Sequence, residues 1–266
     1  MEHRPIFCWP GLGGYPMNLR TLAKSIDGSR PFYGIQAKGI NEGETPYATI
    51  GEMAAADADS IRRVQPVGPY TLWGYSFGAR VAFETAYQLE RSGETVDHLF
   101  LIAPGSPVLR EAADLTATGE DIYRDRAFVT ILFSVFAGTI NGPVLEECLR
   151  ATKNKRTFTD FILSRYGELD RGLVERIISI VRLTYSFEYT FHELVEKQVS
   201  APITVFKARG DDYSFLEGCI TSLANPPVVV DLESDHYGLL KDPGVKELAY
   251  LIGERMRADV LRREAV

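Results

Sequence analysis

Residues 70–80 read Tyr-Thr-Leu-Trp-Gly-Tyr-Ser-Phe-Gly-Ala-Arg, which is an apolar run, a Gly-x-Ser-x-Gly turn and the start of a helical pattern. The run before the turn is typical of a strand, and residues 79–89 place their apolar side chains on one helical stripe. Because Gly74 and Gly78 lack the Cβ atoms that would clash where strand and helix cross, Ser76 can occupy a strained turn above the sheet edge. The pattern indicates that Ser76 is a nucleophile.

The composition narrows the classes of partner. The chain has 266 residues, 45% of them hydrophobic, which is enough to bury the core of one α/β domain with an inserted subdomain. A net charge of -7 and Lys/Arg runs of no more than two residues argue against nucleic acid or an anionic membrane surface as partner. No stretch approaches the roughly 20 apolar residues of a membrane span, and a signal peptide pattern is missing. We therefore expect a cytoplasmic protein.

The cysteines do not suggest a metal or disulfide framework. Cys8, Cys148 and Cys219 are odd in number and form no CxxC pair, so we interpret them as reduced packing residues. We expect no metal site and no bound cofactor. The first predicted strand begins only a few residues after Met1, so we expect a free-standing fold, although an excised domain would show the same pattern.

Strand-like runs alternate with helical patterns along the chain. They lie at residues 6–9, 32–35, 70–73, 98–102, 203–207 and 228–232. This alternation predicts an α/β fold with a mostly parallel central sheet and helices on both faces. Functional groups then collect at the carboxyl ends of the strands.

A long segment without a clear strand separates Pro104 from Ser200. Periodic apolar stretches at 128–136, 158–166 and 174–183 predict helices there, and loops of such length are not expected without structure. We predict a helical lid over approximately residues 108–195, inserted into one domain that spans residues 1–266 and covering Ser76. Its larger apolar side chains could line an acyl tunnel, but packing between helices is favoured for each of them. These are Phe133, Phe136, Ile140, Leu163, Tyr185 and Tyr189.

A nucleophilic serine needs a base, and the base needs an acid that holds its tautomer. Of the four histidines, His3 lies in the N-terminal tail, His98 at a strand start and His192 in a predicted helix. His236 follows the strand-like run 228–232 and precedes the last helix. This is where the order serine, acid, histidine supplies the base, so we expect His236 to fill that role.

The acid is expected after the strand-like run 203–207, in the polar turn that contains Asp211 and Asp212. Both positions precede His236, as the order requires. We prefer Asp212, because the acid usually lies a few residues into the turn, and Asp211 remains the alternative. Asp235 is too close to His236 in sequence to orient its ring.

Two backbone amides are expected to form the oxyanion hole. Phe77 follows the nucleophile at the start of a helix, where N–H groups are unpaired and the partial charge is positive. Leu12 lies in a glycine-rich loop after the first strand, Trp-Pro-Gly-Leu-Gly-Gly at 9–14. No Lys-Ser/Thr pair follows this loop, as a nucleotide-binding loop would require.

Four motifs follow one another along the chain: Trp-Pro-Gly-Leu-Gly-Gly at 9–14, Gly-Tyr-Ser-Phe-Gly at 74–78, Val-Ala-Phe-Glu at 81–84 and Asp-His-Tyr-Gly-Leu-Leu at 235–240. With these motifs in this order, the chain resembles the thioesterases of nonribosomal peptide, polyketide and fatty acid synthases. The resemblance covers nearly the whole chain and is more typical of this family than of lipases. It implies an α/β-hydrolase fold with a helical lid, and a substrate attached by thioester to the phosphopantetheine arm of an acyl or peptidyl carrier protein.

One position departs from the chain-terminating members of that family. Their acid commonly follows the strand after the nucleophile helix, where this chain has Ala103. Alanine cannot orient an imidazole, so the acid must come from the later strand, as in many stand-alone editing thioesterases. This supports the Asp211–Asp212 turn. The elbow itself is more similar to the chain-terminating branch, so the subclass stays mixed.

The resemblance implies a serine thioesterase that releases its product by hydrolysis or cyclisation through an acyl-enzyme. Two other functions remain open. A carboxylesterase or lipase would act on free esters with the same three side chains, and a catalytically silent α/β-hydrolase would bind a ligand in the same pocket.

Overall fold

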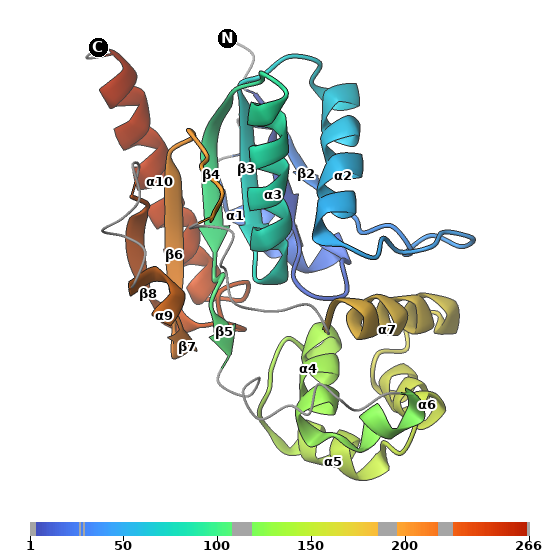
Figure 1. The fold of residues 1–266 in the computed structure, drawn as a ribbon. Helices are drawn as coiled ribbons and strands as arrows, with labels where there is room; N and C mark the ends of the chain where they lie inside the picture. The colour runs from blue at the N-terminus through green and yellow to red at the C-terminus, as the bar shows by residue number, and fades with distance from the viewer. Residues whose placement is uncertain are drawn as a thin grey trace.

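A six-stranded sheet forms the centre of the molecule (Figure 1). The computed structural model describes residues 4–26, 28, 30–107, 119–185, 196–217 and 226–264. The strands are β1 (Ile6–Trp9), β2 (Phe32–Gly34), β3 (Tyr70–Tyr75), β4 (Val96–Ile102), β6 (Ile203–Arg209) and β8 (Val228–Asp235). Their order is β2-β1-β3-β4-β6-β8, and every neighbouring pair is parallel. The predicted α/β fold with a mostly parallel sheet is confirmed.

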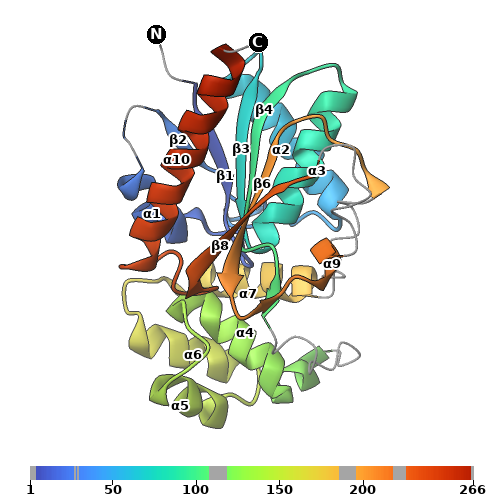
Figure 2. The ribbon, with the colours of Figure 1, turned by 90° about the vertical axis from the view of Figure 1, so that its left-hand side faces the viewer.

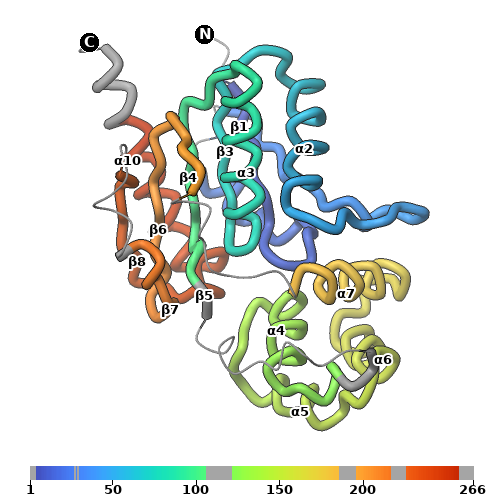
Figure 3. Tube along the Cα trace, viewed as in Figure 1, coloured from blue at the N-terminus to red at the C-terminus, as the bar shows by residue number. Residues whose placement is uncertain are grey.

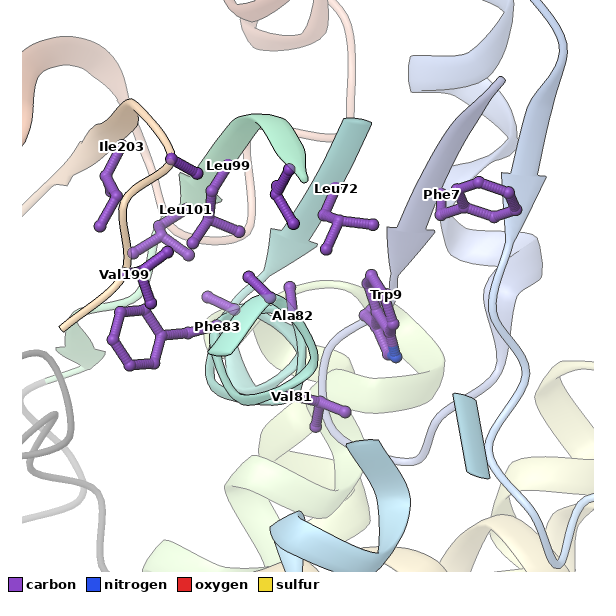
Figure 4. Packing of buried hydrophobic residues seen from close by; sticks show 14 of the residues in the cluster. Phe7, Trp9, Leu72, Val81, Ala82, Phe83, Leu99, Leu101, Val199 and Ile203 are labelled. Carbon is purple, nitrogen blue, oxygen red and sulfur yellow. The ribbon is translucent and has the colours of Figure 1, made fainter. Parts of the chain in front are cut away.

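The register of the strands aligns apolar side chains in rows across the sheet. Phe7 pairs with Leu72, Leu72 with Leu99, and Leu99 with Ile203, so one row crosses four strands. All four residues belong to the core beneath α3, as Figure 4 shows. Burial on both faces explains why β3 and β4 read as continuous apolar runs rather than alternating ones.

Helices cover both faces of the sheet. Helices α2 (Ile50–Val64) and α3 (Phe77–Arg91) pack on one face, and α1 (Arg20–Ser25) and α10 (Gly244–Glu264) on the other, as Figure 2 shows. Two short helices, η1 (Pro16–Leu19) and α9 (Ser214–Glu217), lie in the connections. Trp73 and Phe100 stack on the α10 side with ring centroids 5.5 Å apart. The sheet is thus the middle layer of three.

Within the described residues 119–185, four α-helices lie beyond the carboxyl ends of the strands. They are α4 (Arg126–Ala137), α5 (Pro143–Ala151), α6 (Lys155–Arg165) and α7 (Arg171–Tyr185), preceded by η3 (Gly119–Arg124). They bury an apolar core of their own. Figure 3 shows the loop between β2 and α2 extending on the side of α7, where Arg176 Nε donates to the carbonyl of Ile40 at 2.6 Å. The helices lie within residues 108–195, and their role as a lid stays a prediction.

The structure also locates most of the cysteines and histidines discussed above. Cys8 and Cys148 are buried free thiols, and burial raises the pKa of Cys148 to about 11. His98 lies inside β4 with 4% of its surface exposed. Four of the residues discussed above lie outside the described residues, namely His3, Tyr189, His192 and Cys219.

Among the described helices, none combines the length and the apolar character that crossing a membrane would require.

A second sheet of two strands was not predicted from the sequence. Strand β5 (Ser106–Pro107) follows β4, and β7 (Asp211–Asp212) follows β6. The two pair antiparallel, with Ser106 opposite Asp212 and Pro107 opposite Asp211. This small sheet determines which aspartate faces the candidate site.

Candidate active site

Ser76 occupies a strained turn between β3 and α3. Its φ of 55° and ψ of -125° lie in a region that residues with a Cβ rarely adopt. A Cβ on Gly74 would lie 2.4 Å from the carbonyl oxygen of Gly78, and a Cβ on Gly78 would lie 2.3 Å from that of Pro10. Both glycines are therefore required by close backbone approach. The turn places the Ser76 side chain at the carboxyl edge of the sheet, as predicted.

His236 follows β8 directly and connects Ser76 with an acid. Its Nε2 lies 2.9 Å from Ser76 Oγ, and its Nδ1 lies 2.6 Å from Asp211 Oδ2. Because a carboxylate only accepts, Nδ1 carries the proton and Nε2 is free to accept from the serine hydroxyl. Ser76 is 8% exposed and His236 4%, so these hydrogen bonds are shielded from water. The structure thus brings Ser76, His236 and Asp211 together.

The preference for Asp212 disagrees with this geometry, because Asp212 points away from His236. Its carboxylate accepts from the backbone N–H of Ser214 at 2.8 Å and caps that turn. The two aspartates form β7, and successive residues of a strand point to opposite sides. With Asp211 turned inward, its side chain is 4% exposed, while Asp212 is exposed. The alternative, Asp211, is the carboxylate in place.

Tyr213 is a second side chain in contact with Asp211. Its hydroxyl accepts from the N–H of Ala208 at 2.8 Å and contacts the Asp211 carboxyl. Burial, followed by the charge of Asp211, raises the pKa of Tyr213 far above its ordinary value. The hydroxyl therefore keeps its proton and can donate to Asp211. Gly105 makes room for this ring, since a Cβ there would lie 2.7 Å from Tyr213 Cζ.

The two expected oxyanion donors come from two different elements, the loop after β1 and the start of α3. Phe77 directly follows the nucleophile as the first residue of α3, at the positive end of the helix dipole. Leu12 lines the hollow in front of Ser76, in a loop where Gly14 N–H donates to the Gly11 carbonyl at 3.1 Å. Phe77 lines a separate small cavity on the other side of Gly11. The role of both amides in binding an oxyanion stays a prediction.

A hollow of about 310 Å³ opens in front of Ser76 and His236. The loop after β1, η1, α4 and the loop after β8 form its walls, with Leu12, Met17, Ser134, Val135, Tyr237 and Leu240 among the lining side chains. A second hollow of about 410 Å³ lies on the Asp211 side of His236. Both include Lys241, whose Nζ donates to the carbonyl of Gly138 at 2.6 Å. An ammonium at the carboxyl end of α4 is favourably placed for the helix dipole.

A half-buried carboxylate lies behind the glycine-rich loop. Asp57 of α2 accepts from Trp9 Nε1 at 2.7 Å, beside a small cavity of about 40 Å³ that Gly11 and Phe77 also line. Burial raises the pKa of Asp57 from 3.8 to about 6, and the hydrogen bond from Trp9 opposes this shift. A raised pKa in the folded state means that the carboxylate charge destabilises the fold. Below pH 3.8 the carboxyl is protonated in both the folded and the unfolded state, and the fold has its full stability. Part of that stability is lost as the pH rises through about 6, where the buried carboxyl must ionise.

Asp57→Asn is therefore expected to stabilise the protein at pH 8, by up to about 3 kcal/mol for a shift of two pKa units. The asparagine carbonyl can still accept from Trp9, while the buried charge is removed. The gain should shrink at pH 5, where the wild-type carboxyl is largely protonated. Urea unfolding at the two pH values measures it. Asp59→Asn, an exposed partner of Arg62 on the same helix, is the control and should change stability by less than about 0.5 kcal/mol. A less stable Asp57→Asn protein at pH 8 would contradict the prediction.

Sequence reasoning missed three residues around the site. Tyr75, Tyr213 and Asp57 each contact a residue of the site or of the loop beside it. Tyr75 and Tyr213 adjoin predicted site residues, but their partners are carbonyls and amides that only the folded chain brings near. Asp57 lies in an amphipathic helix, where a carboxylate has the pattern of a solvated side chain.

Comparison with known proteins relates the chain to thioesterase domains. A family model described as "Thioesterase domain" matches residues 4–211. Indigoidine synthase of Streptomyces lavendulae is 58% identical over 254 residues, which cover 94% of this chain and 20% of that protein. Indigoidine synthase of Dickeya dadantii (strain 3937) is 56% identical over 248 residues, covering 93% of this chain and 17% of that protein. The chain thus spans about a fifth of the length of these relatives.

Among solved structures, the Vlm2 thioesterase domain aligns with a TM-score of 0.71 at 21% identity, covering 94% of this chain and 93% of that one. A four-domain nonribosomal peptide synthetase, holo-AB3403, aligns with a TM-score of 0.70 at 19% identity over 94% of this chain and 19% of that one. At these identities the likeness shows the fold, which is that of α/β-hydrolase thioesterases. Since the family model covers most of the chain, the chain belongs to the thioesterase domain family.

Proposed function

We propose that this thioesterase uses Ser76 to release an acyl, polyketide or peptidyl chain from the phosphopantetheine arm of a carrier protein. The observation that supports a serine mechanism is the hydrogen-bonded series Ser76, His236 and Asp211, with distances of 2.9 and 2.6 Å, at the wall of a hollow. The similarity to two indigoidine synthases supports a carrier as partner. The phosphopantetheine belongs to that carrier, so the thioesterase needs no cofactor of its own.

The reaction follows from the positions of the polar groups. His236 Nε2 accepts the Ser76 proton as Oγ attacks the thioester carbonyl, and Asp211 stabilises the imidazolium that forms. The amides of Leu12 and Phe77 hold the oxyanion. The C–S bond then breaks, His236 gives its proton to the leaving sulfur, and pantetheine leaves as the thiol. The acyl group remains on Ser76. His236 next deprotonates water, or an amine or hydroxyl of the substrate, as it attacks the acyl-Ser76 ester. The bond between the acyl carbon and Ser76 Oγ then breaks, His236 returns the proton to Oγ, and a free acid, a lactam or a lactone is released.

An esterase for free esters would use the same three side chains, so the choice of substrate separates the two functions. The protein is mixed with an acyl-pantetheine thioester or the matched oxoester, quenched within milliseconds to seconds, and its intact mass is measured. We expect an acyl adduct that maps to Ser76, formed faster from the thioester, with one thiol released per adduct. A faster reaction with the oxoester would favour the esterase function.

The matched controls for this experiment lie at the two ends of one helix. Ser76 precedes α3, and Ser92 is an exposed serine directly after it. Ser76→Ala should form no adduct, while Ser92→Ala should behave as the wild type. An adduct that persists in Ser76→Ala would contradict the proposed nucleophile. Failure of the wild type to react with either ester or with a fluorophosphonate would favour a catalytically silent binding protein.

A further inference from the structure

Tyr75, the residue before the nucleophile, makes a contact that the mechanism above does not use. Its hydroxyl donates to the backbone carbonyl of His236, with 2.6 Å between the oxygens. We propose that Tyr75 is a positioning residue, whose hydroxyl holds the loop that carries His236 against the strand end that carries Ser76. This inference rests on the proposed roles of Ser76 and His236.

The side chain of Tyr75 reaches His236 because of the direction that β3 gives it. Tyr75 is the last residue of β3 and belongs to the apolar cluster on the α10 side, together with Leu239 and Leu240 of the loop after His236. The rings of Tyr75 and His236 have centroids 5.4 Å apart. Tyr75 is 6% exposed and His236 4%, so their hydrogen bond forms where water competes little.

Three links, one covalent and two hydrogen bonds, join Tyr75, Ser76 and His236 in a closed ring. Tyr75 is covalently joined to Ser76, its hydroxyl bonds the His236 carbonyl at 2.6 Å, and His236 Nε2 bonds Ser76 Oγ at 2.9 Å. Moving the His236 backbone away from β3 would lengthen the second and third links together. The tyrosine hydroxyl therefore constrains the distance between nucleophile and base.

Asp211 cannot supply this constraint alone. Its hydrogen bond to Nδ1 orients the ring of His236, but it comes from β7 and not from the strand that carries Ser76. Within the loop, the N–H of Gly238 donates to Asp235 Oδ1 at 2.7 Å, which folds the loop back on the end of β8. Tyr75 ties the loop to β3 itself. Misplacement of a catalytic group by about 1 Å can cost 10²-fold in rate, so such a tie affects catalysis.

The ring of Tyr75 has a packing role that is separate from its hydroxyl. A Cβ on Gly11 would lie 3.3 Å from Tyr75 Cε1, so the ring supports the backbone next to Leu12. Tyr75→Phe keeps this ring and removes only the hydroxyl. The substitution therefore tests the hydrogen bond without opening a cavity.

We expect Tyr75→Phe to lower kcat about tenfold with KM within twofold of wild type, because one hydrogen bond made to the base loop is lost. The rate at which a fluorophosphonate labels Ser76 should fall by the same factor. The apparent pKa of the acidic limb of the pH–rate profile should not move, because the hydroxyl contacts the backbone of His236 and not its ring. A shift of that limb would overturn a purely positioning role.

Tyr70→Phe is the matched control. Tyr70 lies at the other end of β3, is fully buried and donates its hydroxyl to Glu94. Tyr70→Phe should lose about as much thermal stability as Tyr75→Phe, while its kcat stays at the wild-type value. Equal losses of kcat in the two variants, or wild-type kcat in Tyr75→Phe, would overturn the inference. Assays run well below both melting temperatures keep the comparison valid. Because the fluorophosphonate reports the reactivity of Ser76 with any substrate class, this result does not depend on whether thioesters are the substrates.

Discussion

Asp211→Asn is expected to lower kcat about 10⁴-fold, the loss that removal of the orienting carboxylate causes in serine triads. The carboxylate accepts a hydrogen bond from His236 Nδ1–H at 2.6 Å and is nearly buried. An asparagine amide in its place can donate to Nδ1 and favour the tautomer whose Nε2 carries a hydrogen. That tautomer cannot accept the proton of Ser76. Single-turnover acylation with an acyl-pantetheine thioester measures the effect.

Asp212→Asn is the control that the chain itself provides. The two aspartates are neighbours, yet Asp212 faces Ser214 and solvent. The asparagine carbonyl can still accept from the Ser214 N–H, so kcat should stay within about threefold, since the site geometry does not involve this side chain. A large loss at Asp212 with none at Asp211 would show that the acid is Asp212 after all.

The turn at Ser76 and the position of His236 beside it could be predicted because their signals are local. Gly74 lies close to the backbone of Gly78 within the same five-residue motif, and His236 follows a strand that its apolar run already marks. The choice between Asp211 and Asp212 was not local in this sense. It depends on β7 pairing with β5, a contact between segments about 100 residues apart along the chain. A two-residue strand has too short a pattern to be recognised from its own sequence.

The same reasoning explains why the supporting residues escaped prediction. Tyr75 and His236 are 161 residues apart, and the acceptor is a backbone carbonyl, which any residue could offer. Asp57 and Trp9 are 48 residues apart. By contrast, the parallel sheet was predictable, because apolar strands and intervening helices repeat along the chain. Patterns identify elements, while contacts between distant polar groups need the folded register.

Gly78→Ala is expected to destabilise the protein by roughly 3 to 4 kcal/mol and to lower activity in whatever fraction folds. The new Cβ would lie 2.3 Å from the carbonyl oxygen of Pro10 and 2.6 Å from that of Trp9. Both are backbone atoms, so no side-chain rotation relieves the clash. Either α3 moves away from β1, or the loop that carries Leu12 moves. Each movement alters the space in which the oxyanion is proposed to sit.

The matched control is Gly51→Ala, because Gly51 is the second residue of α2 as Gly78 is of α3. The nearest atom to a Cβ there is Thr49 Oγ1 at 4.0 Å, so the substitution should stabilise the helix by about 0.5 kcal/mol through loss of chain entropy in the unfolded state. Urea unfolding measures the stability of both variants, and fluorophosphonate labelling measures the reactivity of Ser76 in each. Opposite signs of the stability change are required, since both sites are helical and only one lies against another backbone. If Gly78→Ala were as stable and reactive as wild type, close contact at the elbow would not be what demands a glycine there.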